Sequence, residues 1–349
     1  MPSKTVLITG ANGEIGHGLI NFFAQDGSHK IIALDIHDID DTLTDKCSFI
    51  KGSVLDEALL EHIFEKYSFE YVFHLAGILS TGGEKNPLFA HQVNVTGSLN
   101  LLNFTRLAAK KREEKITFLF PSSIAAYGIP TLEQKKKAGK ISEEQYLFPI
   151  TMYGCNKLYI EHMGRYFEAF YGLLEPHRDT YPLIDFRSIR FPGIISAETI
   201  PTGGTSDYGP EMVHSAAQGK SYSCFVRQDT TLPFVVMPEA VDALIKLSEA
   251  KKSQLTRQVY NITSFSVSAS QIAGEVKKYF PQASISYSID PNRQKIVDSW
   301  PGDVDDTKAR SDWGWKPRYS FESAFAEYLM PAVIERYRCS SLKKCQNSS

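Results

Sequence analysis

Residues 5–16 read Thr-Val-Leu-Ile-Thr-Gly-Ala-Asn-Gly-Glu-Ile-Gly. A short apolar run, Val6 to Ile8, leads into glycines at positions 10, 13 and 16, and a helix-compatible segment follows. Glycine lets the backbone approach a phosphate closely, and the free N–H groups at the start of a helix attract an anion. The spacing differs from the G-x-G-x-x-G dinucleotide pattern, so a tight strand-to-helix turn without a ligand is the alternative at this point.

A second apolar stretch ends in an acidic residue. Ile31 to Leu34 is followed by Asp35, near the distance at which a carboxylate binds the adenosine ribose of a dinucleotide. Such a carboxylate accepts both ribose hydroxyls and repels a 2′-phosphate, and no Arg or Lys follows Asp35 before Lys46. The pattern therefore predicts NAD rather than NADP. The nearby acidic residues are interpreted as a solvated loop; they are Asp38, Asp40 and Asp41.

Length and charge restrict the class of protein. The chain has 349 residues, 42% of them hydrophobic, and a formal net charge of −2 with both signs interspersed. This argues against a nucleic-acid-binding face or a polybasic membrane anchor. We expect no signal peptide, because a strand follows Met-Pro-Ser-Lys, and no membrane span, because no apolar run reaches about 18 residues. A cytoplasmic protein is predicted.

The five cysteines are scattered and lack the spacing of metal ligands. They are Cys47, Cys155, Cys224, Cys339 and Cys345. We interpret them as reduced thiols and predict no metal site, because no cluster of His, Cys and carboxylates demands one.

Short apolar runs alternate with helix-like segments through the first half of the chain. The predicted strands are Thr5–Thr9, Ile31–Leu34, Tyr71–Leu75, Thr117–Phe120 and Asp185–Ile189. The predicted helices are Glu14–Asp26, Asp56–Tyr67, Pro87–Lys111 and Met152–Tyr171, then Glu239–Ala250, Ser268–Phe280 and Phe321–Arg336. This alternation predicts an α/β fold with a Rossmann-type doubly wound parallel sheet. The turns after the first four strands should meet at one crevice.

We divide the chain into two lobes. Residues 1–190 form the predicted NAD-binding domain, and residues 191–338 a smaller C-terminal substrate-binding lobe that shares some chain with the first. Residues 339–349 are predicted to be a disordered tail. The charged segment Gln134–Gln145 is interpreted as a surface excursion.

Tyr153 and Lys157 form a second informative pattern. Four residues apart on a helix, they share one face, and a cation near a phenol favours the phenolate. Such a phenol is a general base for an alcohol. The alternative is a helical surface pair. Ser122 and Ser123 leave a predicted strand end, where a hydroxyl could complete the donor set for a substrate oxygen.

Taken together, these features resemble the extended short-chain dehydrogenase/reductase family over Thr5 to about Lys316. The motifs are the glycine turn, His74-Leu-Ala-Gly77, Val-Asn94-Val-Thr-Gly, Ser122-Ser123, Tyr153-x-x-x-Lys157 and Arg190-Phe-Pro-Gly193. The resemblance implies Ser123, Tyr153 and Lys157 as the catalytic set. It also implies that Asn94 supports a proton relay, with a structural hydrogen bond inside its helix as the alternative.

The glycine turn, Asp35 and the resemblance together give a set of predicted NAD contacts. They are Gly10, Asn12, Gly13, Glu14, Ile15, Gly16, Asp35, Ile36, Val54, Leu75, Ala76, Gly77, Asn94, Ser122, Tyr153, Lys157, Phe191, Gly193 and Ile194. Glu14 stands where a neutral side chain is more usual. We expect only its backbone to face the pyrophosphate, with the side chain in solvent.

The second half of the chain resembles one branch of that family, the short-chain L-threonine 3-dehydrogenases. The stretches are Ser122–Gly128, Arg190–Ser196, Gly203-Gly-Thr-Ser-Asp-Tyr208, Asp229–Pro233, Met237-Pro238, Asp298–Pro301 and Asp305-Asp306 into Asp312–Trp315. The resemblance implies NAD-dependent oxidation of the 3-hydroxyl of L-threonine to 2-amino-3-ketobutyrate. Its implied substrate contacts are Ser80, Ser123, Tyr153, Gly204, Thr205, Asp207 and Trp300.

Each substrate residue also has a structural interpretation. Ser80 could be a loop hydroxyl, Asp207 could cap a helix at Tyr208, and Trp300 could be packing. Segments 131–148 and 174–184 are longer than in the simplest members, and Ser53 and Thr202 also depart from the pattern. These departures bear on the choice of substrate rather than on the reaction type.

Two other functions compete with this one. A sugar-nucleotide epimerase or dehydratase would use the same Tyr and Lys, with Arg187, Arg227 and Arg293 available for a second pyrophosphate. A cofactor-sensing regulator without catalysis is the other, although proteins of that kind often lack the Tyr–Lys pair.

A homodimer is predicted as the partner. Apolar residues recur at helical spacing on Met152–Tyr171, wide enough for the monomer's own sheet and a partner helix. They are Tyr159, Ile160, Met163, Tyr166, Phe167 and Phe170. The resemblance implies a four-helix interface with Pro87–Lys111, and burial against the monomer's own sheet alone is the alternative.

Overall fold

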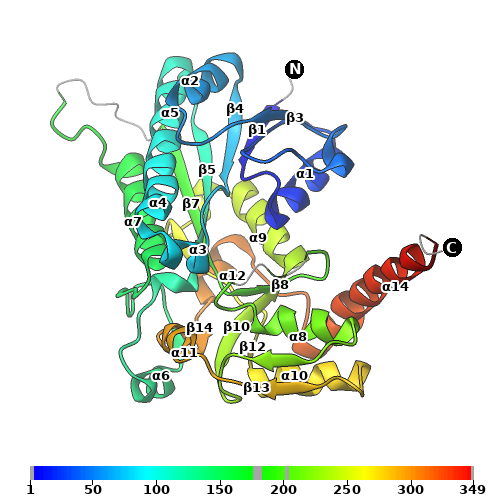
Figure 1. Ribbon diagram of the computed structural model, residues 1–349. Helices are drawn as coiled ribbons and strands as arrows, with labels where there is room; N and C mark the ends of the chain where they lie inside the picture. The colour runs from blue at the N-terminus through cyan, green and yellow to red at the C-terminus, as the bar shows by residue number, and fades with distance from the viewer. Residues whose placement is uncertain (1–3, 176–182, 200, 202–203, 347–349) are drawn as a thin grey trace.

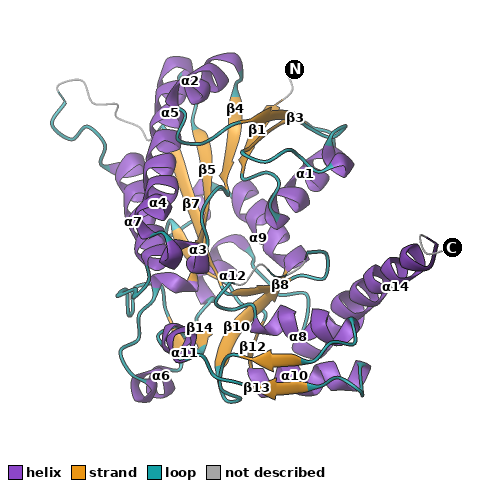
Figure 2. Ribbon diagram, in the orientation of Figure 1, coloured by secondary structure: helices purple, strands orange, loops and turns teal. Residues whose placement is uncertain are grey.

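The computed structural model describes residues 4–175, 183–199, 201 and 204–346. Within them lies a seven-stranded parallel sheet in the order β11-β7-β5-β4-β1-β2-β3 (Figures 1 and 2). The strands are β1 (Lys4–Thr9), β2 (His29–Asp35), β3 (Ser48–Lys51), β4 (Phe69–His74), β5 (Ile116–Ser123), β7 (Ile184–Phe191) and β11 (Val259–Asn261). The order reverses beside β1, which confirms the Rossmann-type doubly wound fold.

Helices cover both faces of this sheet (Figure 1). Successive side chains of a strand point to opposite faces, so Val6 and Ile8 of β1 pack with one helical layer and Leu7 with the other. The first layer contains α1 (Glu14–Asp26), α9 (Met237–Glu249) and α12 (Thr307–Trp313). The second contains α2 (Glu57–Lys66), α5 (Gly97–Arg112) and α7 (Met152–Ala169).

The segment Pro87–Lys111, predicted as one helix, is interrupted. It consists of α4 (Pro87–His91), a π-helical turn at Gln92–Thr96 and α5. A short helix, α3 (Ser80–Lys85), precedes it. Single π-helical turns inside α-helices often mark functional sites, and this one contains Asn94.

The second lobe has its own hydrophobic core below the main sheet (Figure 1). Its strands are β6 (Lys140–Ile141), β8 (Gly193–Ile195), β9 (Tyr222–Cys224), β10 (Thr231–Val236), β12 (Phe265–Ser268), β13 (Ile285–Tyr287) and β14 (Asp303–Val304). Its helices include α6 (Leu132–Ala138), α8 (Tyr208–Ala217), α10 (Ala269–Tyr279), α11 (Pro291–Asp298), α13 (Phe321–Ser323) and α14 (Met330–Gln346). A π-helical turn at Ala324–Leu329 joins the last two, and 3-10 turns lie at Asp41–Leu43, Ile124–Ala126 and Lys252–Gln254.

The two lobes exchange chain in both directions. The segment 134–145, predicted as a surface excursion, contains most of α6 and strand β6, and β6 pairs with β14 and buries Ile141 completely. An apolar residue within the charged segment therefore anchors it to the second lobe. In the other direction, α9 and β11 return to the main sheet.

The C-terminal segment also differs from its prediction. Residues 339–349 were expected to be a disordered tail, but the backbone of α14 stays helical to Gln346, and residues 347–349 lie outside the described part. Figure 1 shows α14 extending away from the body of the second lobe. The polar composition of this segment is compatible with a solvated helix, which sequence composition alone does not separate from a coil. Among the described helices, none is long and apolar enough to cross a membrane.

Candidate active site

The glycine turn joins β1 to α1 at the carboxyl edge of the sheet. Gly10 has a φ of +64°, and a Cβ there would lie 2.6 Å from the backbone nitrogen of Ala76. A Cβ on Gly16 would lie 2.4 Å from the carbonyl oxygen of Ala11. Gly13 precedes α1 without a side-chain cap, so the first turn of the helix keeps N–H groups for an anion. The turn therefore fits a dinucleotide pyrophosphate.

Asp35 ends β2 beside this turn. Its carboxylate accepts hydrogen bonds from the backbone N–H groups of Asn12 (3.0 Å) and His37 (2.9 Å). The Asn12 side chain donates to the carbonyl oxygen of Asp38, whose carboxylate pairs with Lys51 at 2.9 Å. The predicted ribose ligand is thus fixed next to the glycine turn, and the exposed Ile36 follows it.

The loop after β4 is held against the end of β1. The N–H of Leu75 donates to the carbonyl oxygen of Thr9 (3.1 Å), and that of Ala76 to its hydroxyl (3.3 Å). Asn94 clamps the same loop, because its side chain accepts from the N–H of Ile78 (2.7 Å) and donates to its carbonyl oxygen (3.0 Å). The hydrogen bonds of the Asn94 side chain therefore join its helix to the loop. The alternative interpretation, a structural hydrogen bond inside the helix, is wrong.

His74 connects these two contacts. The Ser98 hydroxyl donates to the Asn94 carbonyl oxygen (2.6 Å), so it accepts from Nε2–H of His74 (2.7 Å). Nδ1 of His74 then accepts from the Thr9 hydroxyl (2.8 Å). Burial lowers the pKa of His74 to about 3, which keeps the ring neutral. The chain of hydrogen bonds fixes the loop beside the glycine turn.

Ser123 and Tyr153 meet where β5 ends and α7 begins. Thr151 caps α7 by accepting from the N–H of Gly154, and a Cβ on Gly154 would lie 2.1 Å from the Ala125 carbonyl oxygen. This close approach allows a hydrogen bond between the side chains of Tyr153 and Ser123. Burial raises the pKa of Tyr153 to about 12, and that hydrogen bond opposes the rise.

Lys157 lies one helical turn after Tyr153 and is buried. Its ammonium donates to the Pro121 carbonyl oxygen (2.7 Å) and lies 4.4 Å from the Phe120 ring centroid and 5.5 Å from that of Tyr153. Burial lowers the pKa of Lys157 to about 8, and the charge of Glu161 opposes this. The structure thus brings the three predicted catalytic side chains together.

Two predicted substrate residues meet although 125 positions separate them. The hydroxyls of Ser80 and Thr205 are 3.0 Å apart and buried. Asp207 directly precedes α8 but makes no side-chain cap to it; its carboxylate accepts from the N–H of Gly204 (2.6 Å) instead. Gly203 and Thr202 lie outside the described residues, and Trp300 is buried in the second lobe's core.

Glu14 contradicts its prediction. The sequence predicts a solvent-exposed side chain, but the residue is half-buried. Burial, together with repulsion by Asp207 and Glu198 from the second lobe, raises the pKa of Glu14 to about 7. The reason is tertiary packing, because Glu198, Asp207 and Tyr328 lie close enough to Glu14 to interact with it electrostatically. No local pattern in the sequence reveals this.

Other predicted cofactor residues lie along the carboxyl edge of the main sheet or support it. Val54, Phe191 and Gly193 are buried, and Ile15 and Ile194 are partly buried. The Ser122 hydroxyl donates to Glu161 (2.5 Å), so its side chain serves a buried ion pair. Sequence reasoning missed Glu161, which pairs with Arg190 through two hydrogen bonds of 2.8 and 2.5 Å. Its position, four residues after Lys157 on one helical face, was the available signal.

A family model described as the NAD dependent epimerase/dehydratase family matches residues 6–263. The chain belongs to this family. The predicted membership of the extended short-chain dehydrogenase/reductases is thereby confirmed, including its likeness to L-threonine 3-dehydrogenases.

Relatives of this epimerase/dehydratase family member cover nearly the whole chain. Mitochondrial L-threonine 3-dehydrogenase of Bos taurus is 36% identical over 314 residues, 90% of this chain and 78% of that protein. The L-threonine dehydrogenase structure from Clostridium difficile is 31% identical, with a TM-score of 0.82 over 96% of this chain and 98% of that one. A monomeric L-threonine 3-dehydrogenase from a metagenome database is 34% identical, with a TM-score of 0.81 over 94% and 98%.

The arginines considered for a nucleotide sugar are already engaged in this family member. Arg187 is buried; it donates to the carbonyl oxygens of Ser248 and Ala250 at the end of α9 and to the carboxylate of Asp185. Arg227 binds Asp298 through two hydrogen bonds of 2.9 and 2.8 Å. Arg293 donates to the Gly204 carbonyl oxygen (2.7 Å) and lies over the Phe225 ring. Binding a second pyrophosphate would require breaking such contacts.

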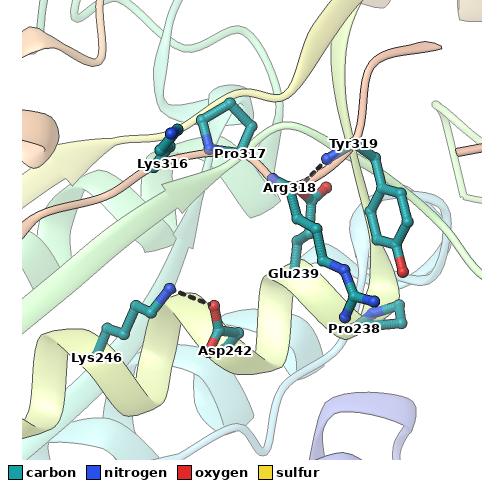
Figure 3. A pocket seen from close by; sticks show the side chains of 8 residues that line it. All are labelled: Pro238, Glu239, Asp242, Lys246, Lys316, Pro317, Arg318 and Tyr319. Carbon is teal, nitrogen blue, oxygen red and sulfur yellow. Dashed lines mark hydrogen bonds and ion pairs between the residues drawn. The ribbon is translucent and has the colours of Figure 1, made fainter. Parts of the chain in front are cut away.

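A cavity of about 590 Å³ lies at α9, lined by none of the predicted site residues. Figure 3 shows Lys246 paired with Asp242, and Glu239 beneath the segment 316–319. Glu239 accepts from the N–H groups of Arg318 and Tyr319 and from the Ser264 hydroxyl, so its carboxylate is satisfied. In the described part of the chain, no group of three His, Cys, Asp or Glu side chains is arranged to hold a metal ion.

Proposed function

We propose that this protein is an NAD-dependent L-threonine 3-dehydrogenase, forming 2-amino-3-ketobutyrate. One observation carries the proposal: the Ser123–Tyr153 hydrogen bond, with Lys157 one turn on, occurs in a chain about one third identical to L-threonine dehydrogenases over most of its length. The choice of NAD over NADP rests on Asp35, whose carboxylate lies beside the glycine turn.

The catalytic side chains divide the work. Ser123 donates to the substrate's 3-oxygen and holds it beside Tyr153. Tyr153, as phenolate, accepts the proton of the 3-hydroxyl, and the charge of Lys157 stabilises that phenolate. When bound, the nicotinamide supplies the acceptor for the hydride from C3. Positioning and proton transfer are enough for this reaction.

Residues of both lobes would hold the amino acid. The hydroxyls of Ser80 and Thr205 can bind the carboxylate, and Asp207 can pair with the ammonium group. Both charges need partners if the pocket excludes water. The buried Ser80–Thr205 contact and the Asp207–Gly204 contact support this assignment, because they place one carboxylate and two hydroxyls on neighbouring segments.

The decisive experiment measures NADH formation by purified protein with NAD and L-threonine. D-threonine, L-allo-threonine, L-serine and NADP serve as parallel controls, and nucleotide sugars are tested for binding in the presence of NAD. We expect turnover with L-threonine and NAD. Protein that binds NAD but leaves L-threonine unchanged would overturn the substrate, and saturable nucleotide-sugar binding would favour the epimerase alternative.

A further inference from the structure

Lys157 has an unusual environment for a residue that must be charged. It is 8% exposed, rests against the Phe120 ring and has the Pro121 carbonyl oxygen as a hydrogen-bond acceptor at 2.7 Å. Removing an ammonium group from water favours its neutral form. A neutral Lys157 could not stabilise the Tyr153 phenolate, so the fold needs a compensating negative charge nearby.

Glu161 provides that charge from the next turn of α7. Its carboxylate is 4% exposed and accepts from Arg190 twice, Nε to Oε1 (2.8 Å) and Nη2 to Oε2 (2.5 Å). The Ser122 hydroxyl also donates to Oε1 (2.5 Å). These bonds hold the carboxylate in place. Its charge favours the protonated form of Lys157.

We propose that Glu161, held by Arg190 and Ser122, is a positioning residue that keeps Lys157 protonated and thereby sets the working pH range of Tyr153. The inference rests on the proposed function of Tyr153 and Lys157. The charged and titratable groups around Lys157 are Tyr153 and Glu161 on α7 and His74 on β4, with Arg190 on β7 behind Glu161. His74 is neutral, so the cluster of Lys157, Arg190 and Glu161 carries one net positive charge, which the phenolate cancels.

The sign of the effect follows from this arrangement. Glu161→Gln keeps the size and much of the hydrogen bonding but removes the negative charge. Lys157 then loses its proton at lower pH, and the alkaline limb of the kcat profile moves down by about one pH unit or more. If Glu161 had only a structural role, Glu161→Gln would lower the stability of the protein without moving the alkaline limb of the kcat profile.

Asp185→Asn, on the strand β7 that also holds Arg190, is a matched control. Asp185 is also buried and pairs with Arg187 at 2.7 Å, but it lies five residues before Arg190, roughly 16 Å along β7. Both substitutions break a buried ion pair, so both should lower the melting temperature. We expect only Glu161→Gln to shift the alkaline limb.

A second measurement does not depend on the substrate. Lysine labelled with carbon-13 at Cε gives an NMR titration of Lys157, whose resonance is assigned by its loss in Lys157→Met. The midpoint should fall in Glu161→Gln and stay at the wild-type value in Asp185→Asn. An unchanged midpoint in Glu161→Gln overturns the inference. If wild-type protein does not oxidise L-threonine, the proposed substrate is wrong, and this titration still decides the role of Glu161.

Discussion

As the proposed general base, Tyr153 would have to ionise in surroundings that oppose ionisation. Burial raises its pKa to about 12, and the Ser123 hydrogen bond offsets part of that rise. The protonated Lys157 is needed to bring the phenolate within reach of neutral pH. We therefore expect Tyr153→Phe to lower kcat for L-threonine by about 10²- to 10⁴-fold, the usual contribution of a general base.

Calorimetry should show unchanged NAD affinity in Tyr153→Phe, because the ring and its packing remain. Tyr159→Phe, an exposed tyrosine on the same helix, should keep wild-type turnover and serves as the control. Turnover retained by Tyr153→Phe would mean that another group removes the proton.

The raised pKa of Glu14 predicts that cofactor binding depends on pH. Its pKa is raised to about 7, so the side chain is neutral below that pH and charged above it. A charged Glu14 at the start of α1 repels the pyrophosphate in the glycine turn. NAD affinity should therefore be highest below about pH 7 and fall as the pH rises, by at most tenfold per pH unit.

The measurement is the Kd for NAD between about pH 6 and pH 9, in wild type and Glu14→Gln. The amide cannot titrate, so its profile should be flat across this range and equal the acid limit of the wild type. Parallel profiles in the two proteins would show that Glu14 does not face the bound cofactor.

At the scale of elements, a matched pair of glycines lies on either side of α1. Gly10 and Gly27 flank α1 with φ values of +64° and +66°. A Cβ on Gly27 meets nothing within 4 Å, whereas one on Gly10 would strike the Ala76 backbone. Gly27→Ala should cost about 1–2 kcal/mol of unfolding free energy from backbone strain alone.

Gly10→Ala carries the same strain and a steric clash in addition. It should lower the free energy of unfolding, measured in urea, by more than Gly27→Ala does, and weaken NAD binding, which Gly27→Ala leaves unchanged. Equal losses of stability and unaltered NAD binding in both variants would show that the loop at Ala76 yields freely.

Elements with strong local patterns were predictable, and those formed by tertiary pairing were not. The helix at Glu14–Asp26 was predicted with the bounds it has, because glycines flank a periodic apolar face. Strands β3 and β11 were missed, since four and three residues carry too little pattern. Likewise, motifs located Ser123, Tyr153 and Lys157, but the Ser80–Thr205 contact depends on how two lobes pack.

At the scale of the whole molecule, an apolar face remains exposed. Helices α4, α5 and α7 lie together on one side of the molecule (Figure 1). Large apolar side chains on these helices, or directly after α7, are 37–77% exposed. They are Leu88, Phe89, Leu107, Tyr159, Tyr166 and Phe170. Ile160, by contrast, is buried in the core between α7 and the main sheet, so α7 has one buried face and one face with exposed apolar side chains.

A second copy of the chain is the partner that the sequence predicts for this face, and burial between copies would remove these side chains from water. One related L-threonine 3-dehydrogenase structure is described as monomeric, so the oligomeric state of this chain has to be measured in solution.

Sedimentation should show a dimer at micromolar concentration. Tyr166→Glu should raise its dissociation constant about tenfold or more, which corresponds to about 1.4 kcal/mol. Ile289→Glu, equally apolar to charged but on the second lobe, should leave it unchanged. A wild-type monomer would show that these exposed residues have another role, whereas a dimer insensitive to Tyr166→Glu would place the interface elsewhere.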